Sequence, residues 1–82
     1  MKQEDDNPQN PGSLEGRYAN AFQVGHSAFE FLLDFGQVSP ESEQVQFHTR
    51  ILTGPVYAKA FLETLRGAIE RYEQTFGTIP SV

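Results

Sequence analysis

Residues 15–37, EGRYANAFQVGHSAFEFLLDFGQ, alternate apolar and polar side chains in two successive runs. Alternation with a period of two is typical of β-strands with one buried face, because neighbouring side chains point to opposite faces. The two runs predict strands over residues 17–24 and 27–35. Residues 44–53 alternate in the same way and predict a third strand. Three such runs separated by turn residues indicate an antiparallel meander.

The alternation divides the side chains of the predicted sheet between an apolar face and a polar face. The apolar face holds Tyr18, Asn20, Phe22, Val24, Phe29, Phe31, Leu33, Phe35, Val45, Phe47, Thr49, Ile51 and Thr53. The polar face holds Arg17, Glu30, Asp34, His48 and Arg50, interrupted by Leu32 and Leu52. Alternation decides which residues share a face, whereas the turns decide which residues lie opposite each other.

The dipeptide Gly25-His26 predicts a two-residue hairpin turn, because a type II′ turn needs positive φ at its first central position and glycine supplies it. A longer loop, residues 36–43 with Pro40, connects the second and third predicted strands. The cross-strand pairs expected from these turns include Arg17–Asp34, Phe22–Phe29, Glu30–Arg50 and Phe35–Val45. The two charged pairs favour this register, since opposite charges directly across from each other are favourable, and a register that is shifted by two residues is the alternative.

Residues 55–76 predict one long helix. Pro55 follows Gly54 and suits the first helical position, where a missing N–H costs nothing, and Gly77 suits the position after the last turn. The apolar stripe of this helix consists of Ala58, Phe61, Leu62, Leu65, Ala68, Ile69, Tyr72 and Phe76. We expect the stripe to pack on the apolar face of the sheet. Six of its members also have the 4-3-4-3-4 spacing of a coiled-coil seam, so a helix–helix dimer contact is the alternative.

The sequence therefore predicts an α+β fold, a three-stranded antiparallel β-meander followed by a C-terminal helix on its apolar face. The expected domain covers residues 16–77. Residues 1–15 are acidic and poor in apolar side chains, which predicts a disordered tail, and residues 78–82 form a short C-terminal tail. A domain of this size buries only about 60% of its unfolded surface and is marginally stable alone.

Composition argues against several classes of function. The net charge is -5 and no cluster of Lys and Arg occurs, which argues against nucleic-acid binding. The chain has no cysteine, so it forms neither a disulfide nor a zinc–thiolate site. No apolar run reaches the roughly 20 residues of a membrane span, and no apolar signal segment is visible, so we expect a cytoplasmic protein with no membrane partner.

Several short motifs recur in an order that resembles a known family. These are Arg17-Tyr18-Ala19-Asn20, Glu30-Phe31, Asp34-Phe35-Gly36, His48-Thr49-Arg50-Ile51, Pro55, Ala58-Lys59 and Leu62. The chain resembles a family of short prokaryotic proteins described only as a domain of unknown function. The likeness extends from about residue 15 to residue 77 and supports the expected domain limits. It implies no activity, cofactor or catalytic residue.

The polar face is the candidate site in the sequence. A histidine beside two carboxylates can bind a metal or transfer protons. In the expected register, however, Glu30 and Asp34 each face an arginine, and a flat sheet face encloses no pocket. We therefore predict no catalytic, cofactor-binding or metal-ligating residue, and we retain as polar-face candidates Arg17, Glu30, Asp34, His48 and Arg50.

These observations favour a small non-enzymatic protein-interaction module that associates with itself. A homodimer or higher homo-oligomer would use the unpaired sheet edges, the polar face or the helix seam, because exposed strand edges pair readily with another chain. A further protein partner is also expected. The alternative is a protein that binds a small ligand or a metal through Glu30, Asp34 and His48 at an oligomer interface.

Overall fold

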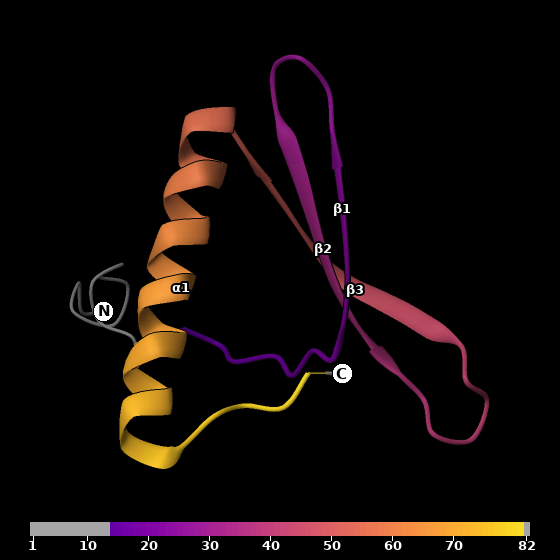
Figure 1. Ribbon diagram of the computed structural model, residues 1–82. Helices are drawn as coiled ribbons and strands as arrows, with labels where there is room; N and C mark the ends of the chain where they lie inside the picture. Colours follow the sequence, from indigo (N-terminus) through magenta and orange to yellow (C-terminus); the bar gives the residue numbers. More distant parts are fainter. Residues whose placement is uncertain (1–13, 82) are drawn as a thin grey trace, which may run out of the picture.

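The structure of the chain is a computed structural model that describes residues 14–81. Its elements are β1 (Ala21–His26), β2 (Phe31–Val38), β3 (Val45–Thr53) and α1 (Pro55–Phe76). The strands form one antiparallel sheet in the order β1-β2-β3, and α1 lies along one side of it (Figure 1). This confirms the predicted β-β-β-α fold. The predicted disordered tail falls almost wholly outside the described residues.

Local signals at both ends fix the bounds of α1. Gly54 is the N-cap and Pro55 occupies the first turn, while the amide of Ala58 donates to the carbonyl oxygen of Gly54 at 2.8 Å. At the other end, Gly77 has φ of 100°, a conformation that side chains disfavour, and its amide donates to the Glu73 carbonyl oxygen at 2.9 Å. The predicted helix bounds are confirmed.

The predicted turn between the first two strands is wrong. Gly25 and His26 belong to β1, and the chain reverses over residues 27–30 instead. The Ser27 amide donates to the Glu30 carbonyl oxygen at 2.9 Å, and the Ser27 hydroxyl oxygen accepts from the amides of Phe29 and Glu30. A serine hydroxyl that bonds to nearby amides closes a turn without glycine. Its hydrogen bonds explain why the chain reverses beyond Gly25.

Both strand registers differ from the expected ones, because the β1–β2 turn comes later than Gly25-His26 and because β2 extends to Val38, into the loop predicted over residues 36–43. Phe22 lies opposite Phe35 rather than Phe29, and Gln23, not Arg17, lies opposite Asp34. On the other side of β2, Arg50 lies opposite Asp34 rather than Glu30. Each of these shifts is an even number of positions, so these residues keep their predicted faces. The predicted pairs Arg17–Asp34 and Glu30–Arg50 are therefore corrected, whereas the predicted faces hold along β1 and β2.

A β-bulge changes the faces in the first half of β3. Phe35 lies opposite Thr49 and Gly36 lies opposite Phe47, so His48 is the extra residue. A Cβ atom on Gly36 would lie 2.3 Å from the Gln46 carbonyl oxygen, which explains the glycine at this close approach. Past the bulge, Phe47 shares the face of Gly36 and Asp34. The predicted place of Phe47 and Val45 on the apolar face is therefore wrong.

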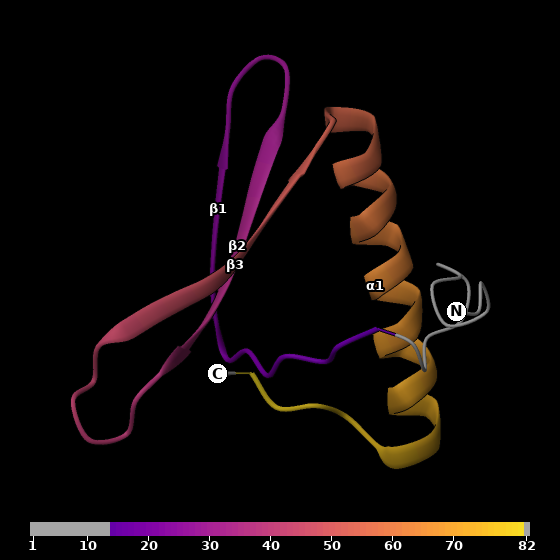
Figure 2. The same cartoon turned by 180° about the vertical axis from the view of Figure 1, so that it is seen from behind.

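The helix faces the apolar side of the sheet without enclosing a core. Among residues 14–81 no hydrophobic side chain is buried. In Figures 1 and 2 the sheet twists strongly, and the far end of the β2–β3 hairpin projects away from α1. α1 faces the side of the sheet that the sequence predicts, but no residue of α1 is buried, so the expected close packing of its apolar stripe on the sheet is not formed.

Candidate functional site

The polar face is organised around Asp34, which is only 5% exposed. The Arg50 guanidinium binds it through two hydrogen bonds, from Nε to Oδ1 at 2.8 Å and from Nη2 to Oδ2 at 2.9 Å. The Gln23 amide group donates from Nε2 to Oδ2 at 2.9 Å. All three residues lie side by side on neighbouring strands. This cluster joins the three strands through one carboxylate.

The same contacts control the ionisation of Asp34. The hydrogen bonds from Arg50 and then from Gln23 lower the pKa of Asp34 from 3.8 to about 2, although burial acts in the opposite direction. The hydrogen bond to Asp34 in turn raises the pKa of Arg50. Both groups are therefore charged at neutral pH. A carboxylate held this strongly as an anion is a poor general acid or base near pH 7.

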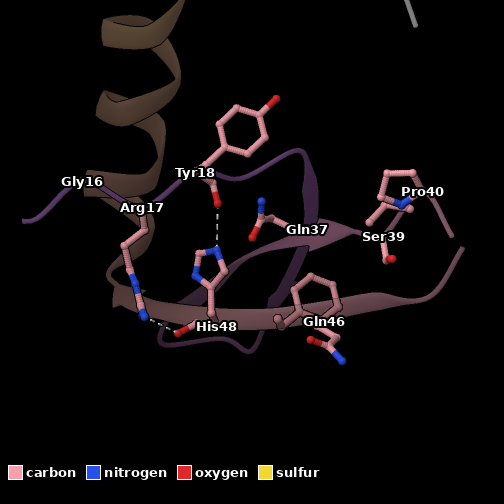
Figure 3. Close-up of a pocket in the computed structure, with 10 residues that line it drawn as sticks. Gly16, Arg17, Tyr18, Gln37, Ser39, Pro40, Gln46 and His48 are labelled. Atoms are coloured by element: carbon pink, nitrogen blue, oxygen red, sulfur yellow. Dashed lines mark hydrogen bonds between the residues drawn. The ribbon is translucent and has the colours of Figure 1, made fainter. Parts of the chain in front are cut away.

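A second polar group links β3 to the segment that precedes β1. The His48 ring contacts the Tyr18 carbonyl oxygen through Nε2 at 2.9 Å and the Thr49 hydroxyl through Nδ1 at 2.7 Å. Arg17 donates from Nη1 to the His48 carbonyl oxygen at 3.3 Å. Figure 3 shows the His48 ring beneath the Tyr18 carbonyl, with Arg17 beside it. These contacts anchor residues 16–18 on the sheet.

The space beside His48 is an open surface pocket of about 530 Å³. The residues that line it are Gly16, Arg17, Tyr18, Gln37, Val38, Ser39, Pro40, Gln46, Phe47 and His48 (Figure 3). Within this pocket, Arg17 and His48 Nε2 bond to backbone carbonyl oxygens of this chain, and His48 Nδ1 bonds to the Thr49 hydroxyl. In the part of the chain that the structure describes, no group of three His, Cys, Asp or Glu side chains is placed to hold a metal ion.

The structure separates the predicted polar-face residues into three places. Asp34 lies with Arg50, and Arg17 lies with His48, although neither arginine has the partner that the expected register gave it. Glu30 lies in the turn between β1 and β2, away from any strand. Sequence reasoning missed Gln23 as a ligand of Asp34. The period-two pattern contained the signal, because Gln23 is a polar residue on the polar side of the first strand.

The opposite side of the sheet carries an apolar groove between the sheet and α1. Phe22 and Val24 from β1, Leu33 and Phe35 from β2, and Phe61 and Leu65 from α1 line it. Its volume is about 160 Å³. We call the apolar side chains on this side of the sheet, together with the apolar stripe of α1, the open apolar face.

The open apolar face extends well beyond the groove. Phe22 is 64% exposed, and Leu62 and Tyr72, further around α1, each expose 51% of their surface. The members that are exposed by about 40% or more are Phe22, Val24, Ile51, Phe61, Leu62, Leu65, Ile69, Tyr72 and Phe76. Monomeric soluble proteins rarely expose a contiguous apolar patch of more than a few hundred Å². The open apolar face is therefore a candidate interaction surface.

Comparison with known proteins identifies the family of the chain but no activity. The chain belongs to the DUF3467 family, which is described as a protein of unknown function, and the match covers residues 4–81. The match confirms the likeness seen in the sequence motifs and is longer at both ends. No curated protein and no solved structure matches the chain. Among residues 14–81, no helix combines the length and the apolar content needed to cross a bilayer.

Proposed function

We propose that this protein is a small non-enzymatic interaction module that associates with itself through its open apolar face. One observation carries the proposal: no hydrophobic side chain of residues 14–81 is buried, although the sheet and α1 each present an apolar surface. Burial of apolar surface is the dominant favourable contribution to folding and to association. A second copy supplies the surface that the single chain lacks.

The area available suits a stable dimer. Nine large side chains that each expose about half of their surface present roughly 800 Å² per copy. A specific protein–protein interface buries about 800 Å² per partner. The open apolar face is therefore large enough to account for a complete interface.

The state of the polar groups supports a non-enzymatic role. Asp34 is occupied by Arg50 and Gln23, and the His48 ring is held by main chain and by Thr49. A general acid or base needs a proton-transfer group with access to substrate and with a pKa near the working pH. Asp34 has neither property, because its pKa is about 2 and its side chain is covered.

Static light scattering across a concentration series tests this proposal. We expect a molar mass of about twice the 9.2 kDa of one chain, falling only on dilution towards the dissociation constant. A variant with Phe22→Ser and Val24→Ser removes two exposed apolar side chains from β1 and should shift the series towards monomer. A mass of 9.2 kDa at every concentration, with the fold retained by circular dichroism, contradicts self-association.

A further inference from the structure

We infer that α1 pairs antiparallel with α1 of a second copy of this chain. The inference rests on the proposed self-association and specifies its geometry. In Figures 1 and 2 the sheet lies on one side of α1, and no element of residues 14–81 lies on its other side. Phe61 and Leu65 of the apolar stripe line the groove toward the sheet, whereas Leu62 and Tyr72 each remain 51% exposed and Phe76 remains 72% exposed.

The stripe has the spacing of a helix–helix seam. Its members at seam positions are Ala58, Leu62, Leu65, Ile69, Tyr72 and Phe76. One flank of this seam carries Phe61 and Ala68, and Phe61 lines the groove against the sheet. The other flank carries Lys59, Arg66 and Glu73. An apolar seam with one charged flank is the pattern of a helix that meets a second helix along that flank.

The order of residues along the seam favours an antiparallel pair. In that orientation Ala58 meets Phe76 of the second copy, Leu62 meets Tyr72, and Leu65 meets Ile69. At each end of the pair, the small Ala58 then lies opposite the large Phe76, so the successive layers of paired side chains have similar volumes. In a parallel pair, Phe76 would meet Phe76 and Ala58 would meet Ala58. The outer layers would then be overfilled at one end and empty at the other.

Charge complementarity points the same way. In an antiparallel pair, the charged flank of one helix faces the charged flank of the other. Lys59 then lies near Glu73 of the second copy, and the two-fold symmetry repeats this contact. Arg66 lies near its own counterpart at the two-fold axis. Its charge is offset within the chain, because Nε lies 3.3 Å from Oε1 of Glu63. A parallel pair would place the charged flank against Phe61 and Ala68 instead.

Disulfide trapping tests this geometry cleanly, because the sequence contains no cysteine. The variants Ala58→Cys and Phe76→Cys are prepared separately, mixed, left to exchange subunits and oxidised. A disulfide needs Cα atoms within about 7 Å. Antiparallel pairing brings residue 58 to residue 76, so the mixture should form at least tenfold more cross-linked dimer than either variant alone.

The matched control uses Ala60→Cys and Gln74→Cys. These positions occupy similar levels along α1 on the side opposite the seam, so antiparallel helices keep them apart. Their mixture should form no more cross-linked dimer than the separate variants. Equal cross-linking in both mixtures would reflect random collision and would overturn the inference.

Two further outcomes separate this inference from the proposed function. Self-cross-linking of Ala58→Cys alone would show a parallel pair, and a dimer by light scattering without any 58–76 cross-link would place the interface elsewhere, such as a sheet edge. Either result overturns the antiparallel helix pair and leaves self-association standing. A monomer by light scattering overturns both.

Discussion

The two faces of this small sheet differ in how far the single chain completes them. On the polar face, Asp34 is covered and fully bonded by Arg50 and Gln23. On the apolar face, Phe22 and Val24 remain mostly exposed even though α1 lies over that side. The sheet thus covers the charged side chain of Asp34 and leaves the hydrophobic side chains of Phe22 and Val24 exposed to solvent. The contrast supports the proposal that a second copy completes the apolar face, whereas the hydrogen bonds of the polar face join the three strands within one chain.

The largest expected effect is from a charge in the seam of α1. Ile69→Glu places a carboxylate in the proposed interface, where an unpaired charge is costly to bury, so the dissociation constant should rise by about 30-fold or more. Gln74→Glu adds the same charge on the opposite side of α1 and should leave the dissociation constant within about threefold. Light scattering dilution series measure both. Equal weakening by the two variants would argue against an interface on the seam.

The next effect is expected at the bulge beneath the polar face. Gly36→Ala places a Cβ atom 2.3 Å from the Gln46 carbonyl oxygen and 2.8 Å from the Phe47 Cα, so the backbone of β3 must move. We expect a loss of about 3 kcal/mol in the free energy of unfolding. Urea denaturation at fixed protein concentration measures it.

Gly25→Ala is the control for the bulge. It also adds a methyl group within the sheet, at a site where nothing lies within 4 Å. Its effect should stay within about 0.5 kcal/mol. A similar loss for both variants would show that the glycine at the bulge has no special role.

A smaller effect is expected from Asp34→Asn, and it should depend on pH. Because the folded-state pKa of Asp34 is about 2 and its ordinary value is 3.8, its ionised form adds stability above pH 3.8. That contribution disappears as the pH falls from about 4 towards 2. The wild type should therefore be more stable than Asp34→Asn at pH 7, and the difference should shrink over this interval.

Denaturation curves of both proteins at several pH values check this dependence. Glu30→Gln, which changes a carboxyl group in the β1–β2 turn outside the Asp34 cluster, is the matched control. A stability difference between wild type and Asp34→Asn that is constant from pH 7 to pH 2 would contradict the assigned role of the carboxylate.

The smallest effects separate two neighbours on β3. Ile51 faces the apolar side and Leu52 the polar side, and both are about half exposed. Ile51→Ser should weaken the dimer and lower its stability by about 1 kcal/mol, because it removes apolar surface from the open apolar face. Leu52→Ser should change stability by less than about 0.5 kcal/mol. A stronger effect of Leu52→Ser on the molar mass would move the interface to the polar face.

The sequence predicts the helix and the strand faces well because these depend on local signals. Pro55 and Gly77 stand at the ends of α1, and the alternation of side chains survives any register shift by an even number of residues. The position of the β1–β2 turn was not predicted correctly, because this stretch contains two residues that each favour a turn. Glycine at position 25 suits a tight turn, but Ser27 closes a different one through its hydroxyl. Nothing in the alternation itself decides between them.

The Asp34 cluster follows from that register and was therefore only partly predictable. The pattern places Gln23, Asp34 and Arg50 on one face, but the β1–β2 turn decides that Gln23 lies opposite Asp34, and the β2–β3 connection decides that Arg50 does. The bulge is harder still to foresee, because it depends on the approach of β3 to Gly36 across the sheet. The exposure of the apolar stripe also depends on the three-dimensional form of the sheet, because the twist of the sheet decides how much of α1 it covers.

The central claim is that a second copy completes the hydrophobic core, and the concentration dependence of unfolding tests it most directly. Urea denaturation would be followed by circular dichroism from about 1 µM to about 100 µM protein. If folding and association are linked, a 100-fold rise in concentration stabilises the folded state by about 2.7 kcal/mol, and the midpoint moves to higher urea. A midpoint that is the same at both concentrations would show that the single chain is stable alone, and it would contradict the account.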